Sequence, residues 1–449
     1  MNAVEVFEDW LDGYLNFERT PKKDIFWLDT IDYLCKRFDN PQDCAPCFHV
    51  AGSKGKGSVS RMISCILEQA GYSVGIYSSP HILDFRERIS KPNSFFDEAI
   101  YEETVRELVP KIESIIPEAL PAKRPLTWFE IVTMYAFLCF RRAKVDWAVY
   151  EVGLGGRLDA TNVIRPKICC ITPIELEHTE FLGNTLEQIA GEKAGIIKNC
   201  TPVIIAPQQN ESINEVLIQK AERRHAPYYF VENLINSLTY SFDKSAKKKN
   251  RMHFELDCSI FSRPLQADLQ LMGGMQAYNA TMAAIAVRKI FPNLPEETIE
   301  KGLENAWLPG RFEIKDNLSN FKDIPFVILD GAHTLNSINL TIQTINQLYS
   351  NEHFNLLFAC AADKDIKDIA KLFVNRFDNV YVTRPGSQKH SDLKLAIESF
   401  TQAGINFKAD KNYFKIIVEA LETSAKENKP LLVIGSFYLV AEVKNILSL

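Results

Sequence analysis

The sequence predicts an α/β protein with two domains, each built on a parallel β-sheet. Short, nearly continuous apolar segments alternate with stretches in which apolar residues recur at helical spacing. A glycine-rich turn stands between an expected strand and an expected helix near residue 52, and a second alternating series begins near residue 325. We find no internal repeat that would indicate another architecture.

The first series supplies the N-terminal domain. Residues 48–51 are expected to form a strand, and the apolar residues from Val59 to Ala70 a helix that ends at Gly71. Further strands are expected at residues 145–150, 167–171 and 202–205, and helices around 129–142 and 185–197. Residues 226–272 are rich in β-forming residues and carry a basic run at 247–251, which predicts a small antiparallel insertion with a solvated turn.

The second series supplies the C-terminal domain. Its strands are expected at residues 326–329, 355–358, 380–383 and 431–434, with helices such as 336–349 and 412–427 between them. Proline and glycine cluster between residues 291 and 310. We therefore expect an N-terminal domain at 1–300, a C-terminal domain at 301–449, and a linker that lets the two approach each other.

Composition narrows the class of protein. The chain has 449 residues, of which 46% are hydrophobic and 24% charged, as in an ordinary globular enzyme. The formal net charge of −6 argues against a nucleic-acid-binding protein. The start of the chain lacks the features of a secretory signal, and no apolar run approaches the length that spans a bilayer. These observations predict a cytoplasmic protein with reduced thiols and no membrane partner.

The glycine-rich turn is the stretch GSKGKGS at residues 52–58. The usual phosphate-binding loop places a hydroxyl residue directly after its lysine, whereas here Gly57 follows Lys56 and the hydroxyl comes at Ser58. Strand, glycine-rich loop and helix still form the context that phosphate binding needs, because N–H groups at a helix N-terminus attract anions. Lys56 could neutralise phosphate charge and Ser58 could reach Mg²⁺; the alternative is a structural turn.

Polar residues follow three of the expected strands, where open α/β sheets bind ligands. Glu151 follows one strand, Glu175, Glu177 and His178 another, and the stretch 330–333 (DGAH) a third. Magnesium prefers oxygen ligands, so Glu151 is the stronger metal candidate and His178 the less usual one. The pair Cys44 and Cys47 has metal or redox spacing, but no second such pair completes a zinc site, which favours two structural thiols.

Ten short stretches, in order along nearly the whole chain, resemble the folylpolyglutamate synthase family, which is often bifunctional with dihydrofolate synthase and belongs to the Mur ligase superfamily. These stretches are HVAGSKGKGS (49–58), YSSPH (77–81), LTWFE (126–130), EVGLGGRLDATN (151–162), HTEFLG (178–183), EKAGI (192–196), QAYNA (276–280), GRFE (310–313), DGAH (330–333) and GSFYLV (435–440). The resemblance also explains the late hydroxyl, which is that family's own variant of the loop.

The resemblance implies a two-domain Mur-ligase-like fold: an N-terminal P-loop ATPase domain with a small β insertion and a Rossmann-like C-terminal domain. It implies that ATP phosphorylates a carboxylate of folate or dihydropteroate, and that the amine of L-glutamate then attacks the acyl phosphate. Two Mg²⁺ ions and a monomer are part of the same expectation. Such a reaction needs cations to screen two anionic groups more than it needs covalent catalysis.

The resemblance also implies roles for single residues. Catalytic roles fall on Lys56, Glu151, His178 and Lys193. The nucleotide is expected to contact Gly52, Ser53, Lys54, Gly55, Lys56, Gly57, Ser58, Asn279, Arg311, Asp330 and His333. One Mg²⁺ is expected to bind Ser58 and Glu151, and a second Ser79, Glu151 and His178. The pterin ring is expected against Thr127, Phe129, Asp159 and Ala160.

Several of these roles have structural alternatives. Lys193 matches a lysine that is carbamylated in the family, but unmodified it would be a cation or one end of an ion pair. Arg311 could form an ordinary salt bridge, His333 could only support its loop, and Phe129 could pack within its helix.

The sequence departs from the family pattern at six positions. They are Ser53-Lys54, Glu175, Glu177, Met275 and Thr334, where Thr-Asn, Gly, Asp, His and Asn are usual. Two other functions stay open: a nucleotide-binding regulator without ligase activity, and a Mur-type ligase for another acid. A Mur-type ligase of that kind usually carries an additional N-terminal domain. The residues before the glycine-rich loop are too few to form one.

Overall fold

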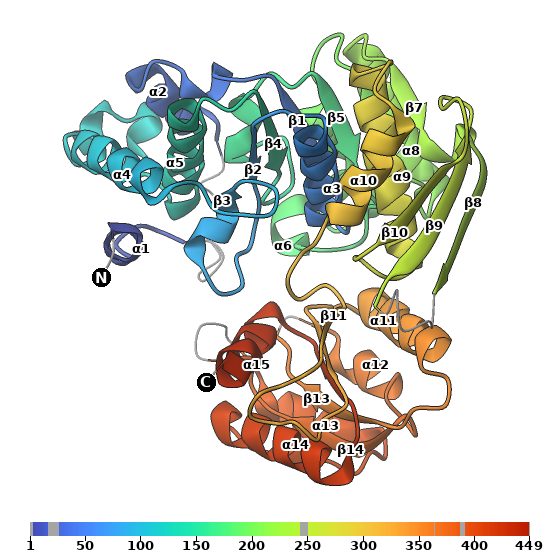
Figure 1. Cartoon of the computed structure of the whole chain (residues 1–449). Coiled ribbons are helices and arrows are strands. Elements are labelled where there is room, and N and C mark those ends of the chain that lie inside the picture. The colour runs from blue at the N-terminus through green and yellow to red at the C-terminus, as the bar shows by residue number, and fades with distance from the viewer. Residues whose placement is uncertain (1–2, 17–26, 243–249, 363, 387–390, 449) are drawn as a thin grey trace. The chain divides into compact units, whose positions relative to one another are not determined.

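The computed structural model describes residues 3–16, 27–242, 250–362, 364–386 and 391–448. Contacts divide the chain into two compact units. The first comprises Met1–Tyr240, His253–Leu269 and Gln276–Trp307, and the second Ser241–Met252, Gln270–Met275 and Leu308–Leu449. The predicted α/β class is confirmed, since each unit contains a largely parallel sheet between helices (Figure 1).

The sheet of the first unit has seven strands in the order β3-β2-β4-β1-β5-β6-β7. They are β1 Cys47–Ala51, β2 Val74–Tyr77, β3 Ile89–Ser90, β4 Trp147–Glu151, β5 Ile168–Ile171, β6 Val203–Ile205 and β7 Tyr228–Phe230. All neighbours are parallel except β2 and β3. The central strands β1 and β5 are buried along their whole length, which explains why they read as continuous apolar runs rather than alternating ones.

Helices surround this sheet. They are α1 Ala3–Leu11, α2 Asp29–Arg37, α3 Lys56–Gln69, α4 Glu98–Glu113, α5 Trp128–Ala143, α6 Thr179–Leu182, α7 Leu186–Lys193, α8 Glu211–Arg223, α9 Gly274–Ile290 and α10 Glu296–Asn305. Helix α3 packs against β1, β2 and β4, and α10 lies beside it (Figure 1). The predicted end of α3 is confirmed: Gly71 has a φ of +91°, and its N–H donates to the carbonyl of Glu68.

Two sequence predictions for this unit need correction. Residues 228–230 form β7 of the main sheet, so the insertion is shorter than 226–272. It consists of β8 Ile235–Phe242, β9 Met252–Cys258 and β10 Leu265–Leu269, in the order β10-β9-β8. The helix expected at 185–197 ends at Lys193 and continues as a 3₁₀ turn, Ala194–Ile196. Residues 247–249 of the basic run lie outside the described residues.

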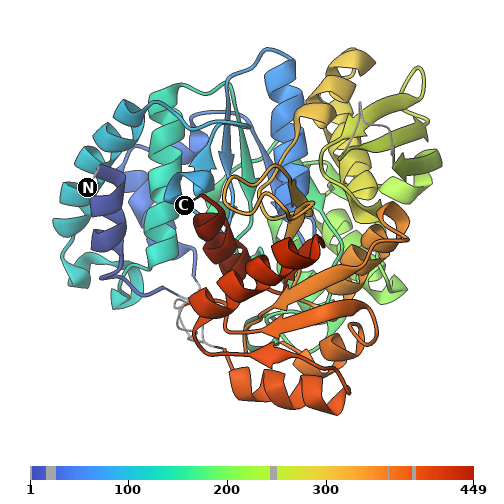
Figure 2. The same cartoon turned by 60° about the horizontal axis from the view of Figure 1, so that its bottom comes forward.

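The second unit has a six-stranded sheet in the order β11-β12-β16-β13-β14-β15. Its strands are β11 Glu313–Lys315, β12 Val327–Asp330, β13 Phe354–Phe358, β14 Phe377–Val382, β15 Lys408–Ala409 and β16 Leu431–Ile434. Only β11 runs antiparallel to its neighbour. Its helices are α11 Leu335–Leu348, α12 Ile366–Lys371, α13 Leu393–Gln402, α14 Tyr413–Glu427 and α15 Phe437–Ser448. Figure 2 shows the orange and red helices on both sides of this sheet.

The parallel register decides where polar residues gather. Glu151 pairs with Val50 across β4 and β1, and Ala51 pairs with Ile171 across β1 and β5. The segments that follow these three strands therefore leave one edge of the sheet together. Within the described part of the chain, no helix combines the length and the apolar character that crossing a membrane would require.

Candidate active site

The glycine-rich loop between β1 and α3 can be built only with glycine at two positions. Gly52 has a φ of +144°, and a Cβ there would lie 1.8 Å from Oγ1 of Thr172. Gly55 has a φ of +88°, and a Cβ there would lie 2.5 Å from Oδ1 of Asn279. The loop backbone is thus pressed against the residue after β5 and against helix α9. This contact brings Asn279, one of the expected nucleotide ligands, to the loop.

Hydrogen bonds also tie this loop to the segment after β5. The N–H groups of Ser53 and Lys54 donate to the carbonyl of Pro173, at 2.9 and 3.3 Å. The Ser53 hydroxyl donates to the Glu175 carbonyl at 3.1 Å and accepts the Glu175 N–H at 3.0 Å. Ser53 and Glu175, both departures from the family pattern, therefore contact each other. The pair holds the two loops together.

Two lysines point to the carbonyl oxygen of Gly52. Nζ of Lys56 donates to it at 3.0 Å, and Nζ of Lys193 donates to it at 2.9 Å. Lys193 is 1% exposed and forms a second contact, an ion pair of 2.8 Å with Oε1 of Glu177. A lysine from the loop and a lysine from the end of α7 thus meet beside one carboxylate.

The environment shifts the ionisation of this pair. Burial lowers the pKa of Lys193, which Glu177 opposes and Lys56 reinforces. Burial alone would raise the pKa of Glu177, but the charges of Lys193, Lys56 and Lys54 outweigh it, so this pKa is lowered. Glu177 therefore remains ionised throughout the neutral range.

The proposed metal ligands lie on four segments of this unit. The N–H of Ser79 donates to Oε2 of Glu151 at 3.2 Å, and a Cβ on Gly57 would lie 3.4 Å from the same oxygen. Ser58, the next residue, is buried. His178 is exposed, has a φ of +46° and precedes α6. Among the described residues, no cluster of three or more His, Cys, Asp and Glu side chains is arranged as a metal site.

The four residues expected at the pterin meet around the loop that follows β4. A Cβ on Gly153 would lie 2.4 Å from Cζ of Phe129, so the loop backbone packs directly on the aromatic ring. Oδ2 of Asp159 accepts the N–H groups of Gly153 and Leu154 at 3.0 and 2.9 Å. Ala160 follows Asp159, and Thr127 caps the helix that carries Phe129. We call Thr127, Phe129, Asp159 and Ala160 the wall.

The second unit gathers its own group of polar residues after β12. Oδ1 of Asp330 accepts the Ala332 N–H at 3.0 Å, and Oδ2 accepts the Thr341 hydroxyl at 2.7 Å. Burial raises the pKa of Asp330, and the charge of Arg311 opposes this shift. Nδ1 of His333 lies 2.8 Å from the Gly331 carbonyl, so as a donor it stabilises its own loop.

Sequence reasoning gave no role to Phe437, which organises this group. The guanidinium of Arg311 lies 4.2 Å from the centre of the Phe437 ring, and the His333 ring 6.3 Å. A Cβ on Gly331 would lie 2.1 Å from the same ring. The matched stretch at 435–440 contained this residue, but an aromatic residue at the start of a helix gives no sign of the cation that it contacts. Sequence reasoning also gave no role to Glu130 and Arg124, and it noted Glu177 only as a polar residue after a strand and as a departure from the family pattern.

Comparison with known proteins places this arrangement in a family. The model of the Mur ligase middle domain matches residues 50–287, and the Mur ligase, glutamate ligase domain matches residues 310–437. The dihydrofolate synthase/folylpolyglutamate synthase of Bacillus subtilis is 30% identical over 448 residues, which cover 98% of each chain. This chain belongs to the folylpolyglutamate synthase/dihydrofolate synthase family of Mur ligases.

Solved structures of this family share the fold. A Mycobacterium tuberculosis folylpolyglutamate synthase complexed with ADP and AMPPCP gives a TM-score of 0.87 at 27% identity, covering 100% of this chain and 98% of that one. An Escherichia coli member in complex with DHPP and ADP gives a TM-score of 0.80 at 26% identity, covering 100% and 99%. The expected family and the two-domain Mur ligase fold are thereby confirmed.

The glycine requirement yields a first prediction. We expect Gly52→Ala to destabilise the fold by the strain of a positive φ, about 1–2 kcal/mol, plus an overpacking cost of about 1–3 kcal/mol against Thr172. Gly71→Ala is the control: Gly71, at the other end of α3, also has a positive φ, +91°, but a Cβ there meets nothing within 4 Å. Urea unfolding of both variants measures the difference, and equal losses would contradict the close contact at Gly52.

Proposed function

We propose that this protein is an ATP-dependent ligase that forms an amide between L-glutamate and a carboxylate of a folate-type acceptor. One observation carries the proposal: three groups of residues meet where the parallel neighbours β1 and β4 end. The glycine-rich loop with Lys56 follows β1 and Glu151 ends β4. Lys193, at the end of α7, donates to the Gly52 carbonyl of that loop, and Phe129 of the wall packs on Gly153, two residues after β4. A phosphate-binding loop next to a wall with an aromatic ring suits a substrate that is anionic at one end and a flat ring at the other. The names of the relatives support the same substrate class.

The reaction that we propose has two steps. An oxygen of the acceptor carboxylate attacks the γ-phosphorus of ATP, a new O–P bond forms, and ADP leaves. The glutamate amine then attacks the acyl carbon, the bond from this carbon to the phosphate oxygen breaks, and phosphate leaves while the nitrogen loses a proton. Lys54 and Lys56 would offset the charge that accumulates around the transferred phosphoryl group. Gly52–Ser58 and Asn279 would hold the nucleotide.

Residues of the second unit would complete the nucleotide site. We assign Arg311, Asp330 and His333 to it, with the Arg311 guanidinium oriented by Phe437. We also propose that the chain divides into an N-terminal domain at residues 1–300 and a C-terminal domain at residues 301–449. Solution scattering with and without an ATP analogue would test closure of the two domains, and an unchanged profile would contradict it.

Magnesium fits the donors of the first unit. A serine hydroxyl and a carboxylate are oxygen ligands of the kind that Mg²⁺ prefers, and the N–H of Ser79 already orients the Glu151 carboxylate. We assign one ion to Ser58 and Glu151, and a second to Ser79, Glu151 and His178. Bound Mg²⁺ would supply Lewis-acid stabilisation of phosphate oxygens.

The decisive experiment measures ADP release that depends on L-glutamate, with dihydropteroate and with tetrahydrofolate as acceptors, and product mass as a second readout. Turnover with both acceptors would identify a bifunctional enzyme, and turnover with one would identify a dedicated synthase. ADP release that does not need glutamate would favour a nucleotide-binding regulator. Turnover only with an unrelated acid would favour another Mur-type ligase.

Glu151→Gln tests the metal assignment. We expect ligation to fall by at least about 100-fold, because the shared ligand loses its charge and several kcal/mol of phosphate stabilisation depend on the metal. Dependence of the residual rate on Mg²⁺ should weaken as well. Glu107→Gln is the control for the loss of a carboxylate. Glu107 lies in α4 and forms ion pairs with Arg141 and Arg142 of α5. Normal turnover of Glu151→Gln would refute the assignment.

We further propose that Lys193 carries a carbamate in the active enzyme. Only an uncharged amine reacts with CO₂, so the burial that lowers the pKa of Lys193 favours the modification. Lys193→Ala should be inactive and should regain part of its activity with short carboxylic acids. Lys198→Ala removes a half-buried lysine that donates hydrogen bonds to Asn162, and the acids should not improve the activity of this variant. Failure of rescue at Lys193 would leave it as the ion-pair partner of Glu177.

The expectation of a monomer in the cytoplasm belongs to the same proposal. Light scattering after size exclusion would test the monomer, and a stable dimer at low concentration would overturn it.

A further inference from the structure

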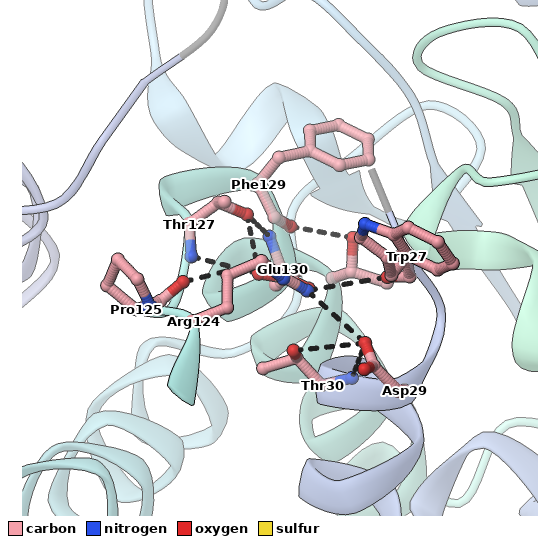
Figure 3. A network of polar contacts seen from close by, with 9 residues as sticks. Trp27, Asp29, Thr30, Arg124, Pro125, Thr127, Phe129 and Glu130 are labelled. Carbon is pink, nitrogen blue, oxygen red and sulfur yellow. Dashed lines mark hydrogen bonds and ion pairs between the residues drawn. The ribbon is translucent and has the colours of Figure 1, made fainter. Parts of the chain in front are cut away.

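A buried ion pair contacts Thr127 of the wall, and no role in the reaction has been assigned to it. Arg124 and Glu130 have side chains that are each 7% exposed, and they form two hydrogen bonds: Nη2 to Oε1 at 2.6 Å and Nη1 to Oε2 at 3.0 Å (Figure 3). Such a forked contact fixes both side chains in orientation as well as in distance. The pair sits at the first turn of α5.

Glu130 uses its remaining capacity on Thr127. Its Oε2 accepts the Thr127 N–H at 2.9 Å and the Thr127 hydroxyl at 2.8 Å, while the Glu130 N–H donates to Thr127 Oγ1 at 3.2 Å (Figure 3). The Glu130 carboxylate thus accepts four hydrogen bonds, two from Arg124 and two from Thr127, of which Oε2 accepts three and Oε1 one. Both of its oxygens are therefore held by protein groups at the start of the helix.

This geometry decides what Thr127 can offer to a ligand. Its hydroxyl proton is donated to Glu130, and one of its lone pairs accepts the Glu130 N–H. What remains on Oγ1 is a single acceptor position. Thr127 can therefore accept a hydrogen bond from an N–H group of a ring, but it cannot donate one while Glu130 holds its proton.

Phe129 is fixed by the same turn. It lies between Thr127 and Glu130, its carbonyl accepts the Thr133 hydroxyl at 2.8 Å, and its ring packs on the backbone of Gly153. Arg124 extends the network to the carbonyl of Trp27 at 3.4 Å and to Asp29 at 3.8 Å. The Trp128 N–H donates to the Leu15 carbonyl at 3.0 Å. The start of α5 is thus held from three separate segments.

We propose that Arg124 and Glu130 are positioning residues for the acceptor: they orient the Thr127 hydroxyl and the Phe129 ring so that a flat heterocycle with an N–H edge is accepted. This inference rests on the proposed function. A buried pair is an expensive way to stabilise a helix end, because desolvation offsets much of the attraction. It is an effective way to fix one orientation of a hydroxyl group, which an apolar pair could not do.

Glu130→Gln tests this proposal. We expect the equilibrium dissociation constant for dihydropteroate or tetrahydrofolate, measured by calorimetry on the full chain, to rise roughly tenfold, the loss expected for one misplaced hydrogen bond. The dissociation constant for ATP should stay within about twofold of the wild type, and KM for the acceptor should rise more than kcat falls.

Glu296→Gln is a closely matched control in the same unit. Oε1 of Glu296 accepts the N–H and the hydroxyl of Ser262, each at 3.1 Å, and the guanidinium of Arg288 at 2.9 Å. The Glu296→Gln variant therefore loses contacts of the same kinds, to a serine N–H, a serine hydroxyl and an arginine, at a position far from α5 in the sequence. Arg124→Lys keeps the charge but not the fork and should give a smaller rise, which keeps the test available if Glu130→Gln does not fold.

Three results would overturn the proposal. Acceptor binding by Glu130→Gln and Arg124→Lys could be unchanged, or acceptor and ATP binding could weaken together, or Glu296→Gln could weaken acceptor binding as much. Each would reduce the pair to a general structural role. A folded wild-type protein that neither binds nor uses a pterin acceptor would instead refute the proposed function, and the positioning role would fall with it.

Discussion

The carbonyl oxygen of Gly52 accepts hydrogen bonds from two ammonium groups, those of Lys56 and Lys193. This contact requires a backbone that no other residue can adopt, because a side chain at position 52 would run into Thr172. It also requires that β1 and β5 be parallel neighbours, so that the residues after them meet at one edge. The position of the two positive charges therefore depends on both the register of the sheet and the glycine at position 52. A site that must screen anions has its cations fixed by backbone geometry rather than by flexible side chains alone.

Glu177 completes that charge arrangement and departs from the aspartate usual in the family. Its ion pair with Lys193 keeps the lysine charged, whereas a carbamate would place two negative groups side by side. The two states of Lys193 therefore exclude each other unless a cation separates the anions. Modification of Lys193, which breaks the ion pair, would then be coupled to metal binding. A bound cation would reduce the repulsion between the carbamate and Glu177, and the two anions would in turn strengthen the binding of the cation. This coupling follows from the contacts of a single buried lysine.

The family, the glycine-rich turn and strands β1, β4, β5, β6, β12, β13, β14 and β16 could be predicted from the sequence, whereas the short strands β2, β3, β11 and β15 were not. The predicted features can be recognised in the sequence alone, because each is a local pattern: a continuous apolar run, the glycines at positions 52 and 55, or one of the ten short matches. The short strand β7 was assigned to the insertion because three residues, Tyr228–Phe230, carry too little pattern to show which sheet they join. The end of α7 at Lys193 was missed since 3₁₀ and α turns share nearly the same spacing. Phe437 could not be found, because its role depends on Arg311, which is distant in the sequence.

Matching motifs also cannot distinguish a residue that touches a ligand from one that builds the site. Asp159 illustrates this difference. Its carboxylate accepts the N–H groups of Gly153, Leu154 and Thr161 and the Thr161 hydroxyl, which together occupy the four positions that a carboxylate offers. Glu130 likewise accepts four hydrogen bonds from protein groups, three at Oε2 and one at Oε1. Both acids of this region thus spend their hydrogen-bonding capacity on protein groups, and burial raises the pKa of Asp159 despite these bonds. In the acceptor site that we propose, recognition would therefore fall to the Phe129 ring, the Thr127 oxygen and backbone groups, and the two acids would affect specificity through the positions in which they hold these groups.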